Sequence, residues 1–212
     1  MQIAFEKFIE LLSNRLRAPL PGSSAHEPLR ATPMGSIRPS FEHKPPPKQG
    51  SVLILLYPDE MQIKFPLTQR PEYAGAHSGQ ISLPGGKAEE GETREKTALR
   101  EGEEEIGIRS SDIEVIGRLT EFFVIPSNFN VTPIIAVHRT KPVFTPDPIE
   151  VVKILEGTLE DLIHDDAIRV KEILAAKIYQ LHAPHFLVEN EVVWGATAMI
   201  LNEFRSIVKE IL

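Results

Sequence analysis

The sequence contains no cysteine and no long apolar run. The first absence excludes disulfide bonds, thiolate metal ligands and a cysteine nucleophile. The second excludes a conventional membrane-spanning helix, which needs roughly 20 predominantly apolar residues. Glu6, Lys7 and Glu10 interrupt the apolar residues of the N-terminus, unlike the core of a secretory signal. We therefore expect a cytoplasmic protein with no membrane partner.

The chain also lacks an excess of basic residues. Its 23 lysines and arginines are outnumbered by 30 aspartates and glutamates, which gives a formal net charge of -7. An acidic protein has no general electrostatic attraction to nucleic acid, so we expect no nucleic-acid partner. Its 212 residues, 42% of them hydrophobic, suit one well-packed globular domain.

The first 50 residues differ in character from the rest of the chain. Apolar residues recur at helical spacing and predict an amphipathic helix over residues 2–17, which Pro19 would end. Residues 18–50 are rich in proline and show no periodicity, so they are predicted to be extended. We expect residues 1–50 to pack on a domain formed by residues 51–212. The segment would either wrap over this domain or exchange between the subunits of a homodimer.

The remaining pattern alternates between strand-like and helix-like segments. Strands are predicted at residues 51–57, 62–69, 114–120, 131–138 and 151–156, and short helices at residues 159–163 and 168–179. A last helix would carry Leu201, Phe204, Val208 and Ile211 on one face. The pattern predicts a mixed sheet flanked by helices, and hence an α/β or α+β fold.

A charged helix over residues 93–105 carries the most informative residues. Glu101, Glu104 and Glu105 are spaced i, i+3 and i+4, so they are predicted to share one helical face. Thr93 is a favoured N-cap residue, and Gly107 lies where a helix would end. A solvated acidic face is the usual interpretation of such a run. A divalent cation with oxygen ligands is the alternative that offsets the like-charge repulsion.

The spacing within this segment favours the cation. It resembles the Nudix box, G-x5-E-x7-R-E-U-x-E-E-x-G-U, in which U is a bulky aliphatic residue. The matching residues are Gly86, Glu92, Arg100, Glu101, Glu104, Glu105, Gly107 and Ile108. One position departs, because Gly102 occupies the first aliphatic position. We expect this glycine to loosen the packing of the helix and to cost about 1 kcal/mol of helix propensity.

The resemblance implies a loop–helix–loop motif on an α/β/α sandwich, with Gly85 and Gly86 forming a tight turn before the helix. It further implies that Glu101, Glu104 and Glu105 coordinate Mg²⁺ or Mn²⁺ in a diphosphate hydrolase. Arg100 would orient a neighbouring glutamate, with Glu92 or Glu104 in reach. The general base would be a glutamate of the helix or an acidic residue of a later loop. For the latter Glu150 is the candidate, although a surface glutamate at a strand start is an equal interpretation.

The segment before the box indicates a substrate. Residues 67–86 resemble the additional signature of the coenzyme A pyrophosphatase branch, L-L-T-x-R-S-x3-R-x3-G-x3-F-P-G-G. The matches are Leu67, Thr68, Arg70, Gly79, Pro84, Gly85 and Gly86, with His77 and Gln80 as frequent companions. Gly75 replaces the second arginine, which a 3′-phosphate on the substrate would need as a partner.

The expected substrate contacts come from this signature and from a loop after the box at residues 125–133. They are Arg70, His77, Gln80, Gly85, Gly86, Asn128 and Phe129. Three of these have plainer interpretations: Arg70 as a surface arginine, His77 as a structural histidine and Phe129 as a packed core residue. Trp194 is interpreted as a core residue.

Three functional hypotheses remain. The first is hydrolysis of CoA or acyl-CoA to 3′,5′-ADP and (acyl-)4′-phosphopantetheine. The second is hydrolysis of ADP-ribose or another nucleoside-diphosphate sugar. The third is a non-catalytic Nudix-like domain that senses a nucleotide. Such domains commonly lose glutamates of the box, and this chain retains Glu101, Glu104 and Glu105.

Overall fold

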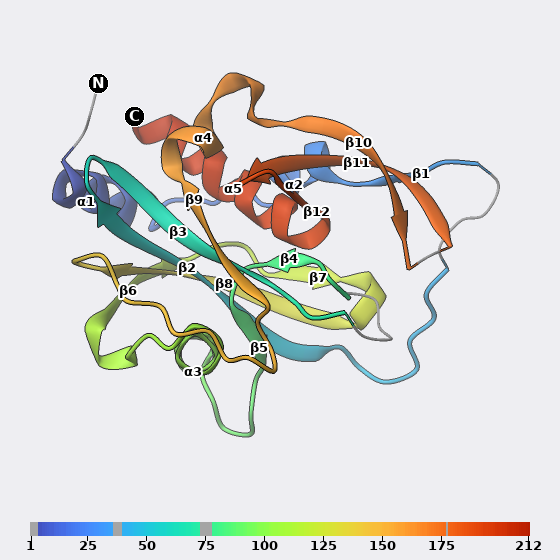
Figure 1. Ribbon diagram of the computed structural model, residues 1–212, viewed down its shortest axis with the longest axis horizontal. Helices are drawn as coiled ribbons and strands as arrows, with labels where there is room; N and C mark the ends of the chain where they lie inside the picture. The colour runs from blue at the N-terminus through green and yellow to red at the C-terminus, as the bar shows by residue number, and fades with distance from the viewer. Residues whose placement is uncertain (1–3, 36–39, 73–77, 177) are drawn as a thin grey trace.

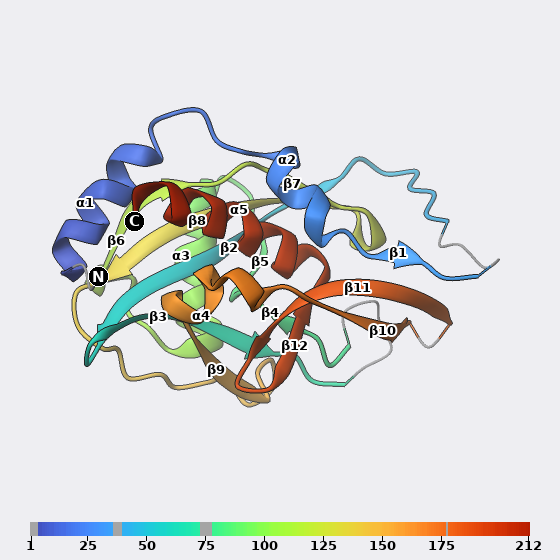
Figure 2. The ribbon, with the colours of Figure 1, turned by 90° about the horizontal axis from the view of Figure 1, so that it is seen from above.

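The computed structural model describes residues 4–35, 40–72, 78–176 and 178–212 (Figure 1). The His77 and Gly75 positions lie outside the described residues. The described chain forms one large sheet, one small sheet and helices on both faces of the large sheet (Figures 1 and 2). This is the mixed α+β architecture that the sequence pattern predicts.

The large sheet has eight strands, with the central order β4-β3-β2-β8-β6. These strands are β2 (Lys48–Asp59), β3 (Gln62–Gln69), β4 (Ile81–Ser82), β6 (Ile113–Arg118) and β8 (Phe129–His138). In addition, β5 (Gly85–Lys87) pairs with β2, β7 (Phe122–Val124) with β8 and β9 (Lys153–Thr158) with β3. The long central strand β2 is parallel to β8 and antiparallel to β3 and β5. All five strands that the sequence predicts are present in this sheet.

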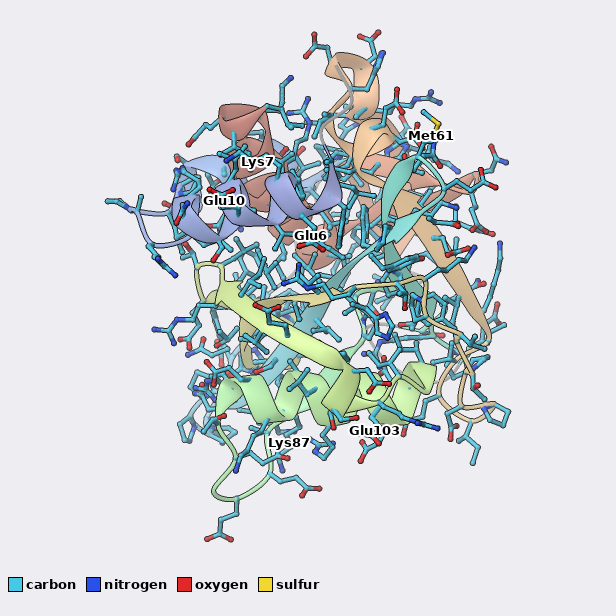
Figure 3. All side chains as sticks on the ribbon, turned by 90° about the vertical axis from the view of Figure 1, so that its left-hand side faces the viewer. Glu6, Lys7, Glu10, Met61, Lys87 and Glu103 are labelled. Carbon is cyan, nitrogen blue, oxygen red and sulfur yellow. The ribbon has the colours of Figure 1, made fainter. Side chains whose placement is uncertain are left out.

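Successive side chains along β2 point to opposite faces of the sheet, and this separates the apolar interior into two layers. Leu53 and Leu55 face α3 (Arg94–Ile106) and pack with its Ala98 and with other buried residues. Ile54 belongs to the larger core on the opposite face, which α1 (Phe5–Arg15) and α5 (Gly195–Ile211) cover. Figure 3 shows Glu103 beside α3, on the opposite side of the sheet from Lys7 and Glu10 of α1. The sheet is therefore the middle layer of an α/β/α sandwich.

A second, four-stranded sheet corrects one sequence prediction. Residues 168–179 are predicted as a helix, but they form β10 (Arg169–Ala175) and its turn into β11 (Tyr179–Val188). The sheet also contains β12 (Glu191–Trp194) and β1 (Thr32–Pro33). The prediction was wrong because apolar and charged residues alternate imperfectly here, and cross-strand pairing with β11 overrides the weak local preference. A short helix, α4 (Leu159–Ile163), precedes it as predicted.

The N-terminal segment is only partly extended. It contains α2 (Ser23–His26) and a 3-10 turn (Glu27–Leu29) before β1 joins the small sheet. The remaining 3-10 turns are Ser110–Asp112, Ile125–Ser127 and Asp165–Ala167. Farther along the segment, His43 contacts the carbonyl of Ile125 and the Asn128 amide donates to the carbonyl of Pro45. None of the helices in the described ranges is long and apolar enough to cross a membrane.

A buried glutamate fastens this segment to α5. Glu203 has an exposed fraction of 0% and contacts the Nε2 of His26 at 3.0 Å. It also accepts hydrogen bonds from the Gly22 N–H at 3.0 Å and the Thr120 hydroxyl at 2.6 Å. Burial raises the pKa of Glu203, but the hydrogen bonds from these three partners outweigh it and hold the pKa below 4.5.

Glu203→Gln tests this arrangement. We expect the variant to lose roughly 1–3 kcal/mol of unfolding free energy at pH 7, because donors around position 203 lose their ionised acceptor. A carboxyl group with a depressed folded-state pKa stabilises the fold above its unfolded pKa and loses that contribution as the pH falls through the folded value. The wild type should therefore lose stability more steeply than the variant below pH 4.5.

Urea unfolding at several pH values measures both effects. Glu210→Gln is the control, since Glu210 lies on the same helix, is exposed and forms an ion pair only with Arg15 among the described residues. Its unfolding free energy should change by less than about 0.5 kcal/mol. Identical acid profiles for the wild type and Glu203→Gln would contradict the assignment.

Candidate active site

Helix α3 begins and ends where its sequence predicts. The Thr93 hydroxyl caps the N-terminus by accepting a hydrogen bond from the Lys96 N–H. Gly107 ends the helix in the left-handed conformation, with a φ of 71°. These two caps set which residues of α3 face the sheet.

Gly102 tightens the packing of α3, contrary to the expected loosening. A Cβ atom at Gly102 would lie 2.8 Å from Cδ2 of Leu53 and 3.1 Å from Cδ1 of Ile108. The absence of a side chain therefore lets the helix approach the sheet closely. A bulky aliphatic residue would displace the helix at this contact.

The glycine pair before the helix allows a second close approach. Gly85 has a φ of +152°, and a Cβ atom there would lie 2.3 Å from the carbonyl oxygen of Ser51. A Cβ atom at Gly86 would lie 2.5 Å from the carboxylate of Glu101. The Glu101 carboxylate thus lies directly over the backbone of β5, in a position that only glycine leaves free.

A cavity of about 560 Å³ opens beside this contact. Its polar end carries acidic groups, one arginine and the glycine pair, namely Arg70, Gln80, Gly85, Gly86, Glu101, Glu105 and Glu150. Its other walls are mainly apolar and aromatic, with Phe122, Phe123, Ile125, Phe129, Tyr179, Leu181, Trp194 and Met199 among the lining residues. The cavity is of a size that is usual for small-molecule sites.

Glu101 and Glu105 bring negative charge to the polar end. Glu105 has an exposed fraction of 3%, and burial raises its pKa to about 7 against the opposing charge of Arg70, 3.9 Å away. Burial likewise raises the pKa of Glu101, although an ion pair with Arg100 opposes it. Because burial destabilises the ionised form of both carboxylates, a cation bound on the cavity side would stabilise them.

Arg100 connects three glutamates of the box. Its guanidinium contacts Glu92 at 2.8 Å, Glu101 at 2.9 Å and Glu104 at 2.8 Å. The hydrogen bond from Arg100 and one from the Glu89 N–H lower the pKa of Glu92 to about 2. Both neighbours that the resemblance offered to Arg100 are thus contacted.

The three glutamates proposed as metal ligands, Glu101, Glu104 and Glu105, are not equivalent in position. Glu101 and Glu105 line the cavity, whereas Glu104 is exposed, held by Arg100 and outside the cavity lining. Within the described residues, no three acidic or histidine side chains already form a complete metal-binding group. Glu150 lines the same cavity from the loop before β9. The acidic side chains that line the cavity offer carboxylate oxygens as ligands, which suit a hard divalent cation.

The structure separates the expected substrate contacts into three groups. Arg70, Gln80 and Phe129 line the cavity, and Arg70 also donates to the Gly85 carbonyl at 3.3 Å. Asn128 does not line it: this residue is buried and its amide binds the proline-rich segment, so we remove it from the candidate contacts. His77 lies outside the described residues.

Several lining residues were not identified from the sequence. Trp194, interpreted as core, is half-buried and lines the cavity. Arg30 and Phe41 reach it from the N-terminal segment, and Tyr179 and Leu181 from β11. No local pattern marks these positions, because they converge only when the small sheet packs beside the large one.

Comparisons with known proteins agree with this geometry. A family model described as the NUDIX domain matches residues 47–184. "Nudix hydrolase 22, chloroplastic" of Arabidopsis thaliana is 36% identical over 164 residues, which cover 73% of this chain and 53% of that protein. "Nudix hydrolase 15, mitochondrial" of the same plant is 36% identical over 171 residues, covering 77% of this chain and 60% of that protein. The chain thus spans less than two thirds of these relatives.

A solved structure shares the fold. The crystal structure of a C. elegans Ap4A hydrolase binary complex superposes with a TM-score of 0.52 at 15% sequence identity. The superposition covers 77% of this chain and 98% of that chain. At this identity the likeness concerns the fold alone.

Gly102→Ala tests the close packing of α3. Alanine favours a helix over glycine by about 1 kcal/mol, but its methyl group would overlap Leu53, and overpacking typically costs about 1–3 kcal/mol. We expect a net decrease in the free energy of unfolding, measured by urea titration. Lys96→Ala, at an exposed position of the same helix, is the control and should change little. A stabilised Gly102→Ala variant would show that the helix is loosely packed.

Proposed function

The chain belongs to the Nudix family, and from this premise we propose that it hydrolyses the diphosphate linkage of a nucleoside-diphosphate derivative with a divalent cation. One observation carries the proposal: Glu101 and Glu105 of the box helix face the same cavity as Glu150. Nudix hydrolases generally need divalent metal ions. For this chain the choice between Mg²⁺ and Mn²⁺ is part of the proposal.

Glu101, Glu104 and Glu105 would hold the cation. Glu101 and Glu105 already face the cavity, and Glu104 would join them by turning its side chain away from Arg100. When bound, the ion neutralises the charge of the diphosphate and activates water for attack. The raised pKa values of Glu101 and Glu105 support this role, since they reflect buried negative charge that a cation would offset.

The remaining polar residues would orient the substrate and the water. Glu150 is exposed in the cavity lining, where it would accept a proton from the attacking water. Arg70 would contact a phosphate oxygen while it stays close to Glu105. Water adds across the phosphoanhydride and one P–O bond of the bridge breaks, so each product keeps one of the two phosphate groups of the linkage.

The apolar walls support CoA or acyl-CoA as the substrate. A nucleoside-diphosphate sugar such as ADP-ribose carries polar groups on both sides of its diphosphate, and it would leave much of this cavity poorly matched. The pantetheine arm and its acyl chain would instead bury apolar surface against side chains such as Tyr179, Leu181 and Trp194. The products would be 3′,5′-ADP and (acyl-)4′-phosphopantetheine.

The cytoplasmic location and the homodimer remain proposals. The absence of cysteine supports a reducing compartment, whereas the names of the two plant relatives assign those proteins to organelles. The homodimer would have to form while the N-terminal segment stays wrapped on its own domain, because that segment contributes Arg30 and Phe41 to the cavity.

Substitutions of the acidic residues test the mechanism. Glu150→Gln should lower kcat by roughly 10²–10⁴-fold if it is the general base, and should leave the affinity for Mn²⁺ unchanged. Glu105→Gln should weaken Mn²⁺ binding as well as turnover, since it removes a charged ligand. Steady-state kinetics and titration of Mn²⁺ by electron paramagnetic resonance measure these effects.

Glu103→Gln is the matched control for both variants. Glu103 lies on the same helix, is exposed and is absent from the cavity lining, so its turnover should equal that of the wild type (Figure 3). If Glu105→Gln retained full activity, the metal site would be misassigned. A protein with no turnover of any diphosphate but intact nucleotide binding would be a sensor.

A substrate panel tests specificity. CoA, octanoyl-CoA, dephospho-CoA and ADP-ribose are compared by kcat/KM, with products identified by mass spectrometry. We expect CoA or its thioester to exceed ADP-ribose by at least about tenfold, equivalent to 1.4 kcal/mol. Trp194→Ala should raise KM for octanoyl-CoA more than for CoA, because it removes apolar wall area.

Val170→Ala is the control for the small sheet. Val170 lies on β10, is exposed and does not line the cavity, so its kinetics should not change. A preference for ADP-ribose would refute the CoA assignment and leave diphosphate hydrolysis in place.

A further inference from the structure

Ser51 carries a buried hydroxyl group that the proposed mechanism does not yet use. The residue has an exposed fraction of 0%, and its Oγ has no hydrogen-bond partner among the described residues. A buried polar atom without a partner costs about 1–3 kcal/mol. Such a group in an otherwise well-packed strand indicates a partner that arrives with a ligand or a change of side-chain position.

Strand pairing shows what Ser51 faces. In the antiparallel ladder between β2 and β5, Ser51 is directly opposite Gly86. Side chains of directly opposite residues lie on the same face of a sheet, about 4.5–5.5 Å apart at their Cβ atoms. The Cβ position of Gly86 lies 2.5 Å from the carboxylate of Glu101. Ser51 and the Glu101 carboxylate are therefore neighbours on the α3 side of the sheet.

The surroundings explain why a hydroxyl at this position is unusual. The next residues of β2 on the same face, Leu53 and Leu55, pack into the apolar layer under α3. A small apolar residue at position 51 would continue that layer at no cost in polar burial. Ser51 instead lies among the cavity-lining residues, together with Gly86 and Glu101.

The ion pair between Arg100 and Glu101 leaves room for a second hydrogen-bond donor to the Glu101 carboxylate. Arg100 contacts Oε1 of Glu101 at 2.9 Å, on the side of the carboxylate that leads out of the cavity toward Glu104. A cation in the cavity would attract the same carboxylate inward. A donor on the buried side, at Ser51, would then hold Glu101 in the inward orientation.

We infer that Ser51 is a positioning residue, whose hydroxyl donates a hydrogen bond to Glu101 when this carboxylate turns to bind the divalent cation. The inference rests on the proposed metal site. Partners that orient metal-ligating carboxylates in this way typically change metal affinity by about 10–100-fold when they are removed. Ser51 would therefore act on metal affinity and not on the stability of the free protein.

Ser51→Ala separates these two roles. We expect its dissociation constant for Mn²⁺, measured by electron paramagnetic resonance in the absence of substrate, to rise by about tenfold. The Tm of the metal-free variant should be unchanged or higher, since the substitution removes a buried hydroxyl without a partner. A purely structural serine predicts the opposite: a lower Tm with unchanged Mn²⁺ affinity. That result would overturn the inference.

Two further variants complete the experiment. Ser51→Thr retains the hydroxyl and should recover at least part of the Mn²⁺ affinity lost in Ser51→Ala. Glu105→Gln reports on the metal site itself and should weaken Mn²⁺ binding independently of Ser51. If Glu105→Gln weakens binding and Ser51→Ala does not, only the role of Ser51 is refuted. If neither weakens binding, the metal site and the inference both fail.

Discussion

The arrangement of the site depends on one electrostatic constraint: two carboxylates of one helix are buried against a sheet. Glu105 is almost fully enclosed, and Glu101 lies over the backbone of Gly86. Burial raises the pKa of both, because a buried ionised group loses its hydration. Arg70 offsets part of the charge of Glu105, and Arg100 offsets part of the charge of Glu101. The polar end of the cavity is thus prepared for a further positive charge.

Glycines make this burial possible by bringing backbone elements unusually close together. Gly102 allows α3 to rest on Leu53, and Gly86 allows a carboxylate to rest on β5. Gly85 approaches the carbonyl of Ser51 in the adjacent strand with a φ that favours glycine. A Cβ atom at Gly85 would overlap the backbone of the adjacent strand, whereas a Cβ atom at Gly86 or Gly102 would force the Glu101 carboxylate or the Leu53 and Ile108 side chains to move.

Part of the apolar end of the cavity comes from segments that flank the family match at residues 47–184. Phe41 comes from the N-terminal segment and Trp194 from the end of β12. The buried contact of His26 with Glu203 supports this wall, since the His26 ring also packs edge-on against Phe122 of the lining. The two helix carboxylates of the polar end come from the box, whereas Phe41 and Trp194 at the apolar end come from outside the family match.

The sequence by itself determined the helix of the box, its caps at Thr93 and Gly107, the central strands and the family, because these follow from local spacing and periodicity. Local spacing also identified Glu101 and Glu105, but it did not distinguish them from Glu104, whose orientation depends on Arg100. Only the tertiary structure decided that Arg169–Ala175 form a strand, that Asn128 anchors the proline-rich segment, and that Ser51 lies beside Glu101. These outcomes depend on contacts between residues that are distant in the chain, and no single window of sequence contains both partners of such a contact.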